Sequence, residues 1–262
     1  MSKRRPISSR IAHSTADRIE IHGLDLNRDL IGVVNLGDMA FLELTSRLPT
    51  AAESIVINAL LVTLVEHGLT PSVLAARLTL LGAPEALQAA VAAGLLGLGG
   101  VFVGSIEGAA RMVQEGMDGS GTDVDEIARR IVKDHRSREA ILPGLGHPTH
   151  REEDPRTRRL FSVAEENGIS GRHVALMRAI GAEAEASYGR LLPVNATGAI
   201  GAVASDLGIP WRICRGLGVM ARAVGLAGHL LEEMEHPIAG ELWSWRNARA
   251  RTENGQRRSR TR

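Results

Sequence analysis

A histidine and an arginine stand at the two ends of one short loop that could carry acid–base and carboxylate-binding chemistry. His147 follows the run Pro143-Gly-Leu-Gly, and the tripeptide Asp154-Pro155-Arg156 comes a few residues later. An imidazole exchanges a proton near neutral pH, and a guanidinium holds a carboxylate through two parallel hydrogen bonds. This pairing suits chemistry on a small polycarboxylate. A loop rich in glycine and proline is more often only a connection, so the residue types alone leave both interpretations open.

The same loop has features that would position these side chains. Gly144 and Gly146 allow positive φ and a close approach of the backbone to a ligand. Pro155 fixes φ, and with Asp154 as its cap it could open a helix that carries Arg156. The sequence therefore predicts a tight turn followed by the first turn of a helix.

The composition predicts that the elements around this loop are helices. Of the 262 residues, 44% are apolar but only 3% are aromatic. The core must then be built from Ala, Leu, Val and Ile, which favours close-packed helices over a sandwich or barrel, where aromatic and β-branched residues are enriched. We expect an all-α fold, organised as one large domain or as one domain with a smaller lobe.

Helix-start and helix-stop residues follow one another along most of the chain. They predict helices from Thr50 to Gly68, from Thr70 to Gly82, after Pro84, from Thr122 or Asp123 through Ile131, and over 156–167, 171–189, 198–207 and 211–235. Thr50 and Glu53 have the spacing of a capping box. Only residues 18–33, with Ile19-Glu20-Ile21 before His22-Gly23, are typical of a short β-hairpin.

The stretch Ala86–Ile106 carries no charge and has about the length of a membrane helix. It is rich in glycine, its neighbours are amphipathic, and no second apolar span accompanies it. We therefore predict one helix buried on all sides at a domain or dimer centre, and no membrane association.

An excess of positive over negative charge is found only at the two ends of the chain. Residues 246–262 hold seven arginines and one glutamate, whereas residues 11–245 contain 20 basic and 29 acidic residues. A nucleic-acid-binding protein needs a basic face on the folded body, so we expect no nucleic-acid partner. We predict a disordered basic N-terminus over 1–17, the main domain over 18–245 and a disordered Arg-rich tail over 246–262.

Cysteine content and the N-terminal residues indicate the compartment. The only cysteine, Cys214, excludes an internal disulfide and fits a reducing environment. The N-terminal sequence MSKRRPISSR has no apolar leader segment. We expect a cytoplasmic protein.

The segment Leu142–Arg156 resembles the PG-x-GH…DPR motif of the citrate synthase superfamily, which includes the citryl-CoA lyases and the citryl-CoA-cleaving module of ATP-citrate lyase. The resemblance extends over about residues 29–245 and implies a multi-helix fold with a large and a small lobe, and a homodimer or higher homo-oligomer. Synthases usually carry a histidine just before the glycine at position 104, where this chain has Val103. The resemblance is therefore greater to the lyases.

The resemblance implies roles for residues from several segments. His147 would accept the proton of the substrate's tertiary hydroxyl group. His67, in an acidic-His-Gly segment at a helix end, would contact the oxaloacetate half of the substrate. Arg156, Arg222 and Asn195 would bind the substrate, the two arginines through its carboxylates.

Coenzyme A, as the thioester substrate or product, is the implied cofactor. The resemblance implies that Pro143, Gly144, Leu145, Gly146 and Arg151 lie along it. No spacing of histidines and acidic residues indicates a metal site, so none is expected.

Thr197 departs from the family pattern at the position that resemblance makes catalytic. The family has an aspartate there that exchanges a proton with the acetyl carbon, and a threonine hydroxyl cannot do this near neutral pH. Three alternatives stay open: another group supplies the proton (Glu107, Asp206 or a water held by Thr197), the substrate differs, or catalysis is weak.

The function predicted from the sequence is a citryl-CoA lyase-type retro-Claisen cleavage. A 3-hydroxy-tricarboxyl CoA thioester would yield acetyl-CoA and oxaloacetate. The alternatives are condensation in the citrate synthase direction, action on another 3-hydroxyacyl-CoA, and a non-catalytic relative that only binds CoA or carboxylates.

Overall fold

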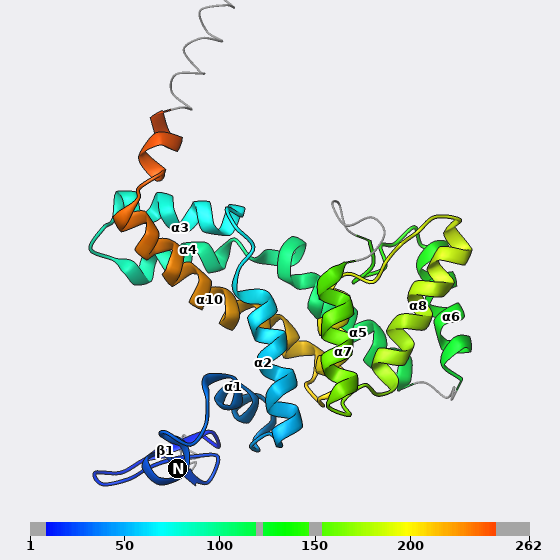
Figure 1. Cartoon of the computed structure of the whole chain (residues 1–262), viewed down its shortest axis with the longest axis horizontal. Helices are drawn as coiled ribbons and strands as arrows, with labels where there is room; N and C mark the ends of the chain where they lie inside the picture. Colours follow the sequence, from blue (N-terminus) through cyan, green and yellow to red (C-terminus); the bar gives the residue numbers. More distant parts are fainter. Residues whose placement is uncertain (1–8, 119–122, 147–153, 245–262) are drawn as a thin grey trace, which may run out of the picture. The chain divides into compact units, whose positions relative to one another are not determined.

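Helices make up most of the chain in the computed structural model, which describes residues 9–118, 123–146 and 154–244 (Figure 1). The chain forms two compact units: residues 1–61 with 105–215 (unit 1), and residues 62–104 with 216–262 (unit 2). The helical prediction is confirmed.

Unit 1 begins with a small antiparallel sheet of β1 (Ala12–Ser14), β2 (Ile19–Ile21) and β3 (Leu24–Asp25), in that order. His22 and Gly23, both with positive φ, turn the chain between β2 and β3, as the predicted hairpin requires. Residues 1–17 were expected to lack regular structure, but β1 lies within this range. It is ordered as a strand because its backbone pairs with β2. Residues 1–8 of the predicted disordered N-terminus and the whole of the predicted tail, 246–262, lie outside the described residues.

The helices of unit 1 pack around a helix made largely of small residues. After the π-helical turn η1 (Leu26–Leu30), unit 1 contains α1 (Leu36–Thr45), the first part of α2 (Ala51–Val65), α5 (Gly104–Met117), α6 (Val124–Ser137), α7 (Pro155–Glu166), α8 (Arg172–Tyr188), α9 (Ala196–Asp206) and the start of α10 (Trp211–Glu235). α8 packs against α6 and α9, and α7 against α9. Residues 198–205 of α9 are all buried, so α9 is the centre of the unit 1 core.

Unit 2 is a smaller group of helices: α3 (Pro71–Gly82), α4 (Leu87–Leu96) and most of α10 lie together (Figure 1). Its buried core consists of Val73, Ala76, Leu80, Ala90, Leu226 and Leu230. The chain crosses between the units within α2, at the start of α5 and within α10.

Several helix starts match the residues that predicted them. Thr50 and Glu53 form a capping box, with the Glu53 N–H donating to the Thr50 hydroxyl at 3.2 Å and the Thr50 N–H donating to the Glu53 carboxylate at 2.8 Å. Thr70 caps α3 with Pro71 in its first turn, and Asp123 caps α6. α1 was not predicted from the sequence, although Asn35 and Asp38 form a reciprocal cap at its start.

The prediction of one fully buried helix over Ala86–Ile106 is wrong. α4 ends at Leu96, a π-helical turn η2 (Gly99–Val103) follows, and α5 begins at Gly104. Leu96 and Val101 are about 85% exposed in the single chain (85% and 86%). The glycines at 97, 99 and 100 weaken helix formation by about 1 kcal/mol each relative to alanine, which accounts for the break. No single described helix is both long and apolar enough to cross a membrane; α4 and Gly99–Met117 meet that test only jointly, as a bent pair.

Cys214 lies in the core of unit 1 and is fully buried. Burial, with a smaller contribution from the nearby Glu107 carboxylate, raises the pKa of its thiol to about 12. The sulfur faces the carbonyl oxygens of Ile209 and Pro210. This thiol is therefore protonated and shielded from solvent.

Candidate active site

The loop Pro143–Gly146 lies against the start of α9 through its backbone. Leu145 forms an isolated antiparallel bridge with Val194, and the Gly146 N–H donates to the carbonyl of Pro193 at 2.7 Å. Gly144 and Gly146 have φ of +85° and +74°, the left-handed region that the sequence predicted for them. His147 and Arg151 lie outside the described residues, so the structure gives no position for the predicted base or for the basic residue implied to contact CoA.

Gly144 and Gly198 make the closest approach between this loop and α9. A Cβ on Gly198 would lie 2.4 Å from the carbonyl oxygen of Gly144, and a Cβ on Gly144 would lie 2.5 Å from the Cα of Gly198. Neither position can therefore carry a side chain unless the backbone moves. This contact fixes the loop at the N-terminus of α9.

Asn195 joins the loop to the helix. Its amide nitrogen donates to the Gly146 carbonyl at 2.7 Å, and its backbone N–H donates to the Gly144 carbonyl at 2.9 Å. Its side-chain oxygen accepts from the N–H groups of Thr197 and Gly198, which makes Asn195 the N-cap of α9. The structure thus gives Asn195 a structural role beside the loop, and its contact with a substrate stays a prediction.

The Thr197 hydroxyl is part of the same cap. Its Oγ1 donates to the side-chain oxygen of Asn195 at 2.7 Å. Because the single hydroxyl hydrogen is used in this bond, only the lone pairs of Oγ1 remain to accept a hydrogen bond.

Asp154 is completely buried and holds Arg156 in a two-pronged ion pair. The guanidinium donates from Nε to Oδ1 at 3.0 Å and from Nη2 to Oδ2 at 2.8 Å. Oδ2 also accepts the N–H of Ala196 at 3.1 Å, and Oδ1 caps α7 by accepting the N–H of Arg156. Burial acts to raise the pKa of Asp154, but the Arg156 pair and these N–H bonds outweigh it, so the pKa is lowered.

This ion pair fixes the orientation of the Arg156 guanidinium group and leaves part of it exposed. Its two bonds to Asp154 use two of the five guanidinium N–H donors, and the Arg156 side chain is 32% exposed. The Asp154–Ala196 bond places Arg156 beside the N-terminus of α9. The sequence predicted Asp154 as a cap but missed that its carboxylate links α7 to α9.

The two acidic residues considered as replacements for the family aspartate are engaged elsewhere in unit 1. Asp206 ends α9, nine residues after Thr197, and accepts the N–H groups of Gly171, His173 and Val174 at the start of α8 together with the His173 ring. At 1.5 Å per residue, α9 separates Asp206 from Thr197 by about 13 Å. Asp206 is therefore unsuited to replace the family aspartate.

Glu107 forms an ion pair with Arg215, with 2.9 Å between Oε2 and Nε. It lies on α5 two residues before Ala109, whose methyl group lies beside Gly201 of α9 and Gly144 of the loop. The Glu107 carboxylate instead pairs with a residue near the start of α10.

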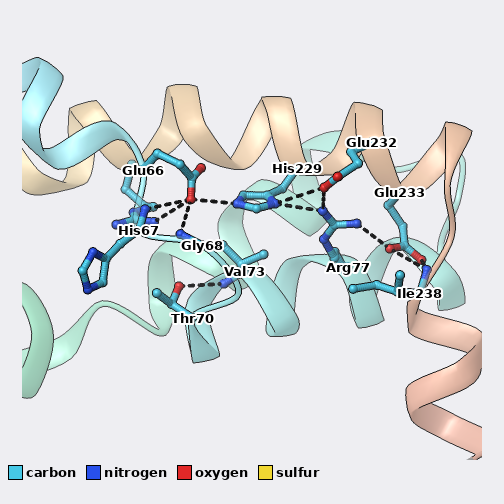
Figure 2. A network of polar contacts seen from close by, with 11 residues as sticks. Glu66, His67, Gly68, Thr70, Val73, Arg77, His229, Glu232, Glu233 and Ile238 are labelled. Carbon is cyan, nitrogen blue, oxygen red and sulfur yellow. Dashed lines mark hydrogen bonds and ion pairs between the residues drawn. The ribbon is translucent and has the colours of Figure 1, made fainter. Parts of the chain in front are cut away.

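His67 and Arg222, the other predicted substrate contacts, belong to unit 2. His67 follows the C-terminal end of α2, as predicted, and its ring points away from the polar contacts around it (Figure 2). Arg222 lies on α10 with its side chain 11% exposed, and its Nη1 is buried without a hydrogen-bond partner in the described part of the chain. Burial lowers the pKa of Arg222, against the opposing effect of the Glu66 carboxylate.

The Glu66 carboxylate lies at the centre of the contacts near His67. Its Oε1 accepts the N–H groups of His67 and Gly68, each at 2.8 Å, and lies 2.9 Å from His229 Nε2. The distance from Oε1 to Arg222 Nη1 is 3.8 Å. Gly225 allows this arrangement, because a Cβ there would lie 2.1 Å from the Val65 carbonyl oxygen.

Comparison with known proteins identifies the class. The family described as "Citrate synthase, C-terminal domain" matches residues 18–243. This helical chain of two units therefore belongs to the citrate synthase family.

The proteins to which the chain is similar include a putative citrate synthase and a citryl-CoA lyase. The chain is 29% identical over 185 residues to "Putative citrate synthase 2" of Mycobacterium tuberculosis, a match that covers 68% of this chain and 47% of the relative. The chain thus spans about half the length of the curated relatives it matches. Among solved structures, citryl-CoA lyase from Hydrogenobacter thermophilus has a TM-score of 0.82 and 33% identity, covering 88% of both chains. ATP citrate lyase from Methanothrix soehngenii, in complex with citrate and coenzyme A, shares the fold, with a TM-score of 0.77 and 22% identity. The match covers 90% of this chain and 40% of that lyase.

Proposed function

We propose that this protein is an enzyme that cleaves a citryl-CoA-type thioester into acetyl-CoA and oxaloacetate. The observation that carries the proposal is the likeness to citryl-CoA lyase, which extends over 88% of both chains at 33% identity. The similarity to the putative citrate synthase covers only 47% of that relative. Val103, at the position where synthases usually have a histidine, favours the same branch.

In the proposed reaction, His147 accepts the proton of the tertiary hydroxyl group. The carbon–carbon bond then breaks, the former hydroxyl oxygen becomes the keto group of oxaloacetate, and the electron pair passes to the thioester as an enolate. General base catalysis by a histidine typically contributes about 10²–10⁴-fold. Asp154 supports this proposal through Arg156, because the ion pair between them orients the remaining guanidinium donors for a substrate carboxylate.

The enolate must still gain a proton on carbon, and Thr197 cannot supply it directly. Its hydroxyl hydrogen is donated to Asn195, but its Oγ1 lone pairs can accept a hydrogen bond from a water molecule. We assign the proton to such a water, and the hydroxide that this leaves takes up the proton that His147 accepted, so that the histidine returns to its neutral form. The bond that the Thr197 hydroxyl donates to Asn195 favours this choice, because it turns the acceptor side of the hydroxyl away from the cap.

Incubation of the protein with citryl-CoA tests the proposal. Oxaloacetate should accumulate, measured through its reduction by malate dehydrogenase and NADH, and His147→Ala should abolish it. His236→Ala, which removes an exposed histidine after α10, is the matched control and should retain turnover. Turnover that survives His147→Ala would contradict the role of His147 as the base.

The Thr197 cap also favours a second candidate, a non-catalytic relative that binds CoA and carboxylates. In that case citryl-CoA binds, as calorimetry would detect, but yields no oxaloacetate. Absence of both binding and turnover would contradict both candidates.

A further inference from the structure

Arg222 has an unusual environment for a cation. Its side chain is only 11% exposed, and its Nη1 has no hydrogen-bond partner among the described residues. Glu66 is its ion-pair partner, but the distance from Arg222 Nη1 to Glu66 Oε1 is 3.8 Å, which is too long for a hydrogen bond. A buried guanidinium with an unused donor is costly unless a ligand completes it.

Glu66 is held short of Arg222 by three other donors. Its Oε1 receives the two backbone N–H groups that follow α2 and the ring of His229. An oxygen that accepts three hydrogen bonds has no good geometry left for a fourth donor. The Glu66 side chain is 48% exposed, so without this restraint it would have room to rotate toward Arg222.

The orientation of the His229 ring follows from its other neighbour. Arg77 Nη2 lies 2.8 Å from His229 Nδ1, and a guanidinium can only donate. Nδ1 must therefore accept, and the ring hydrogen lies on Nε2, which donates to Glu66. Glu232 Oε2 is 3.6 Å from Nδ1 and is too far to form a hydrogen bond with it.

Arg77 is itself buried and is held by two carboxylates. It is 1% exposed, pairs with Glu232, and donates from Nη1 to Glu233 at 2.8 Å. Glu233 in turn accepts the N–H groups of Ile238 and Ala239. Figure 2 shows these contacts running along α10 from Glu233 to Glu66. The position of Glu66 is thus set by a continuous line of hydrogen bonds.

We infer that His229 is a positioning residue that restrains Glu66 and so keeps Arg222 open for a carboxylate of the substrate. The inference rests on the proposed function and on the role in carboxylate binding that the family resemblance implies for Arg222. His229 itself need not touch the substrate. Its effect is on affinity for the carboxylate, because it removes an internal competitor.

Calorimetric titration with oxaloacetate tests this role in four forms of the full chain: wild type, His229→Ala, Glu66→Gln and the double variant. His229→Ala should bind oxaloacetate about tenfold more weakly, because Glu66 then pairs with Arg222. Glu66→Gln, whose amide oxygen still accepts the same three donors but carries no charge, should bind at least as tightly as wild type. The double variant should regain affinity to within about twofold of wild type.

Rescue by the second substitution separates positioning from a purely structural role. Equal affinity of wild type and His229→Ala, or equal weakness of His229→Ala and the double variant, would overturn the inference. Should His229→Ala not fold, weaker binding by Glu66→Gln would overturn it, whereas equal or tighter binding would support it. A wild-type protein that binds no oxaloacetate would instead overturn the proposed function. His236→Ala, an exposed histidine on the same unit, is the matched control and should bind as wild type does.

Discussion

Thr197 donates its hydroxyl hydrogen to Asn195, and this bond determines what the residue can contribute to chemistry. It can accept a hydrogen bond from water, but it has no proton to give to carbon. The sequence identified this position by its family resemblance, and the structure adds that the hydroxyl belongs to the helix cap. The two carboxylates that the sequence offered instead, Asp206 and Glu107, are paired with other groups.

Restoring the carboxylate at this position should increase turnover. We expect Thr197→Asp to raise the rate of citryl-CoA cleavage by at least about 100-fold, because a positioned general acid typically contributes 10²–10⁴-fold. Stopped assays of acetyl-CoA release measure the change. Thr197→Ser, which keeps the hydroxyl and its cap bond, should remain within severalfold of wild type. No gain from Thr197→Asp would show that proton transfer to carbon does not limit the rate.

Asp154 offers a second test at the level of one side chain. Asp154→Asn keeps a good N-cap residue but removes the charge that orients Arg156. We expect carboxylate affinity to fall and the free energy of unfolding to fall by about 1–3 kcal/mol, since a buried charge-assisted bond is lost. Oxaloacetate titration and urea unfolding measure the two effects. Unchanged affinity alongside lost stability would restrict Asp154 to a structural role.

At the level of helices and turns, local residue patterns predicted most of the elements. The caps at Thr50, Thr70, Asp123 and Asp154 act through neighbours only two or three residues away, which is why the sequence revealed them. The break after α4 was not predicted, because the long uncharged run over 86–106 indicated one helix despite the helix-weakening effect of its glycines. Long-range contacts, such as Asp154 with Ala196, leave no local pattern.

Glycine at 198 should be indispensable for the loop geometry. We expect Gly198→Ala to destabilise unit 1 by about 1–3 kcal/mol, because the new methyl group forces the Gly144 backbone away. Gly228→Ala is the matched control: it also lies in a helix, a Cβ there would meet nothing within 4 Å, and it should stabilise by about 0.5–1 kcal/mol. Thermal unfolding followed by circular dichroism compares the two. Equal melting temperatures of Gly198→Ala and wild type would contradict the close contact.

The connection from α9 to α8 through Asp206 should depend on pH. Burial acts to raise the pKa of Asp206, but the His173 ring and three backbone N–H groups outweigh it, so its pKa in the folded state is lowered. The stabilisation is therefore present above the ordinary aspartate pKa of about 3.9 and is lost as the pH falls through the lower, folded-state value.

Asp206→Asn makes this pH dependence measurable. The variant should be less stable than wild type by about 1–3 kcal/mol at pH 7, and the difference should shrink as the pH falls below about 4. Urea unfolding at pH 7 and near pH 3 gives both values. A difference that stays constant over this range would contradict the lowered pKa.

At the scale of the whole molecule, the family, the helical class and a large and a small lobe were expected from the sequence, whereas the positions of the boundaries between the two units were not. The chain passes between the units inside α2 and α10, so no linker or change of composition marks the boundaries. Of the residues for which the resemblance implies carboxylate binding, Arg156 belongs to unit 1 and Arg222 to unit 2.

Binding of substrate fragments should stabilise the full chain by mass action. Oxaloacetate at 100 times its Kd should add about 2.7 kcal/mol to the free energy of unfolding, which raises the Tm by several degrees for a chain of this size. Differential scanning calorimetry measures the shift. Acetate, a monocarboxylate, is the control ligand and should have little effect. No shift with oxaloacetate at any concentration would contradict specific binding.

The burial of Cys214 has a practical consequence for studies of this protein in solution. As the only cysteine in the sequence, and with a pKa of about 12, its sulfur should remain inert toward maleimide reagents while the chain is folded. A cysteine introduced at an exposed position, such as that of His236, would then take up a fluorescent dye selectively. The native residue need not be replaced first, so labelling leaves the core of unit 1 intact.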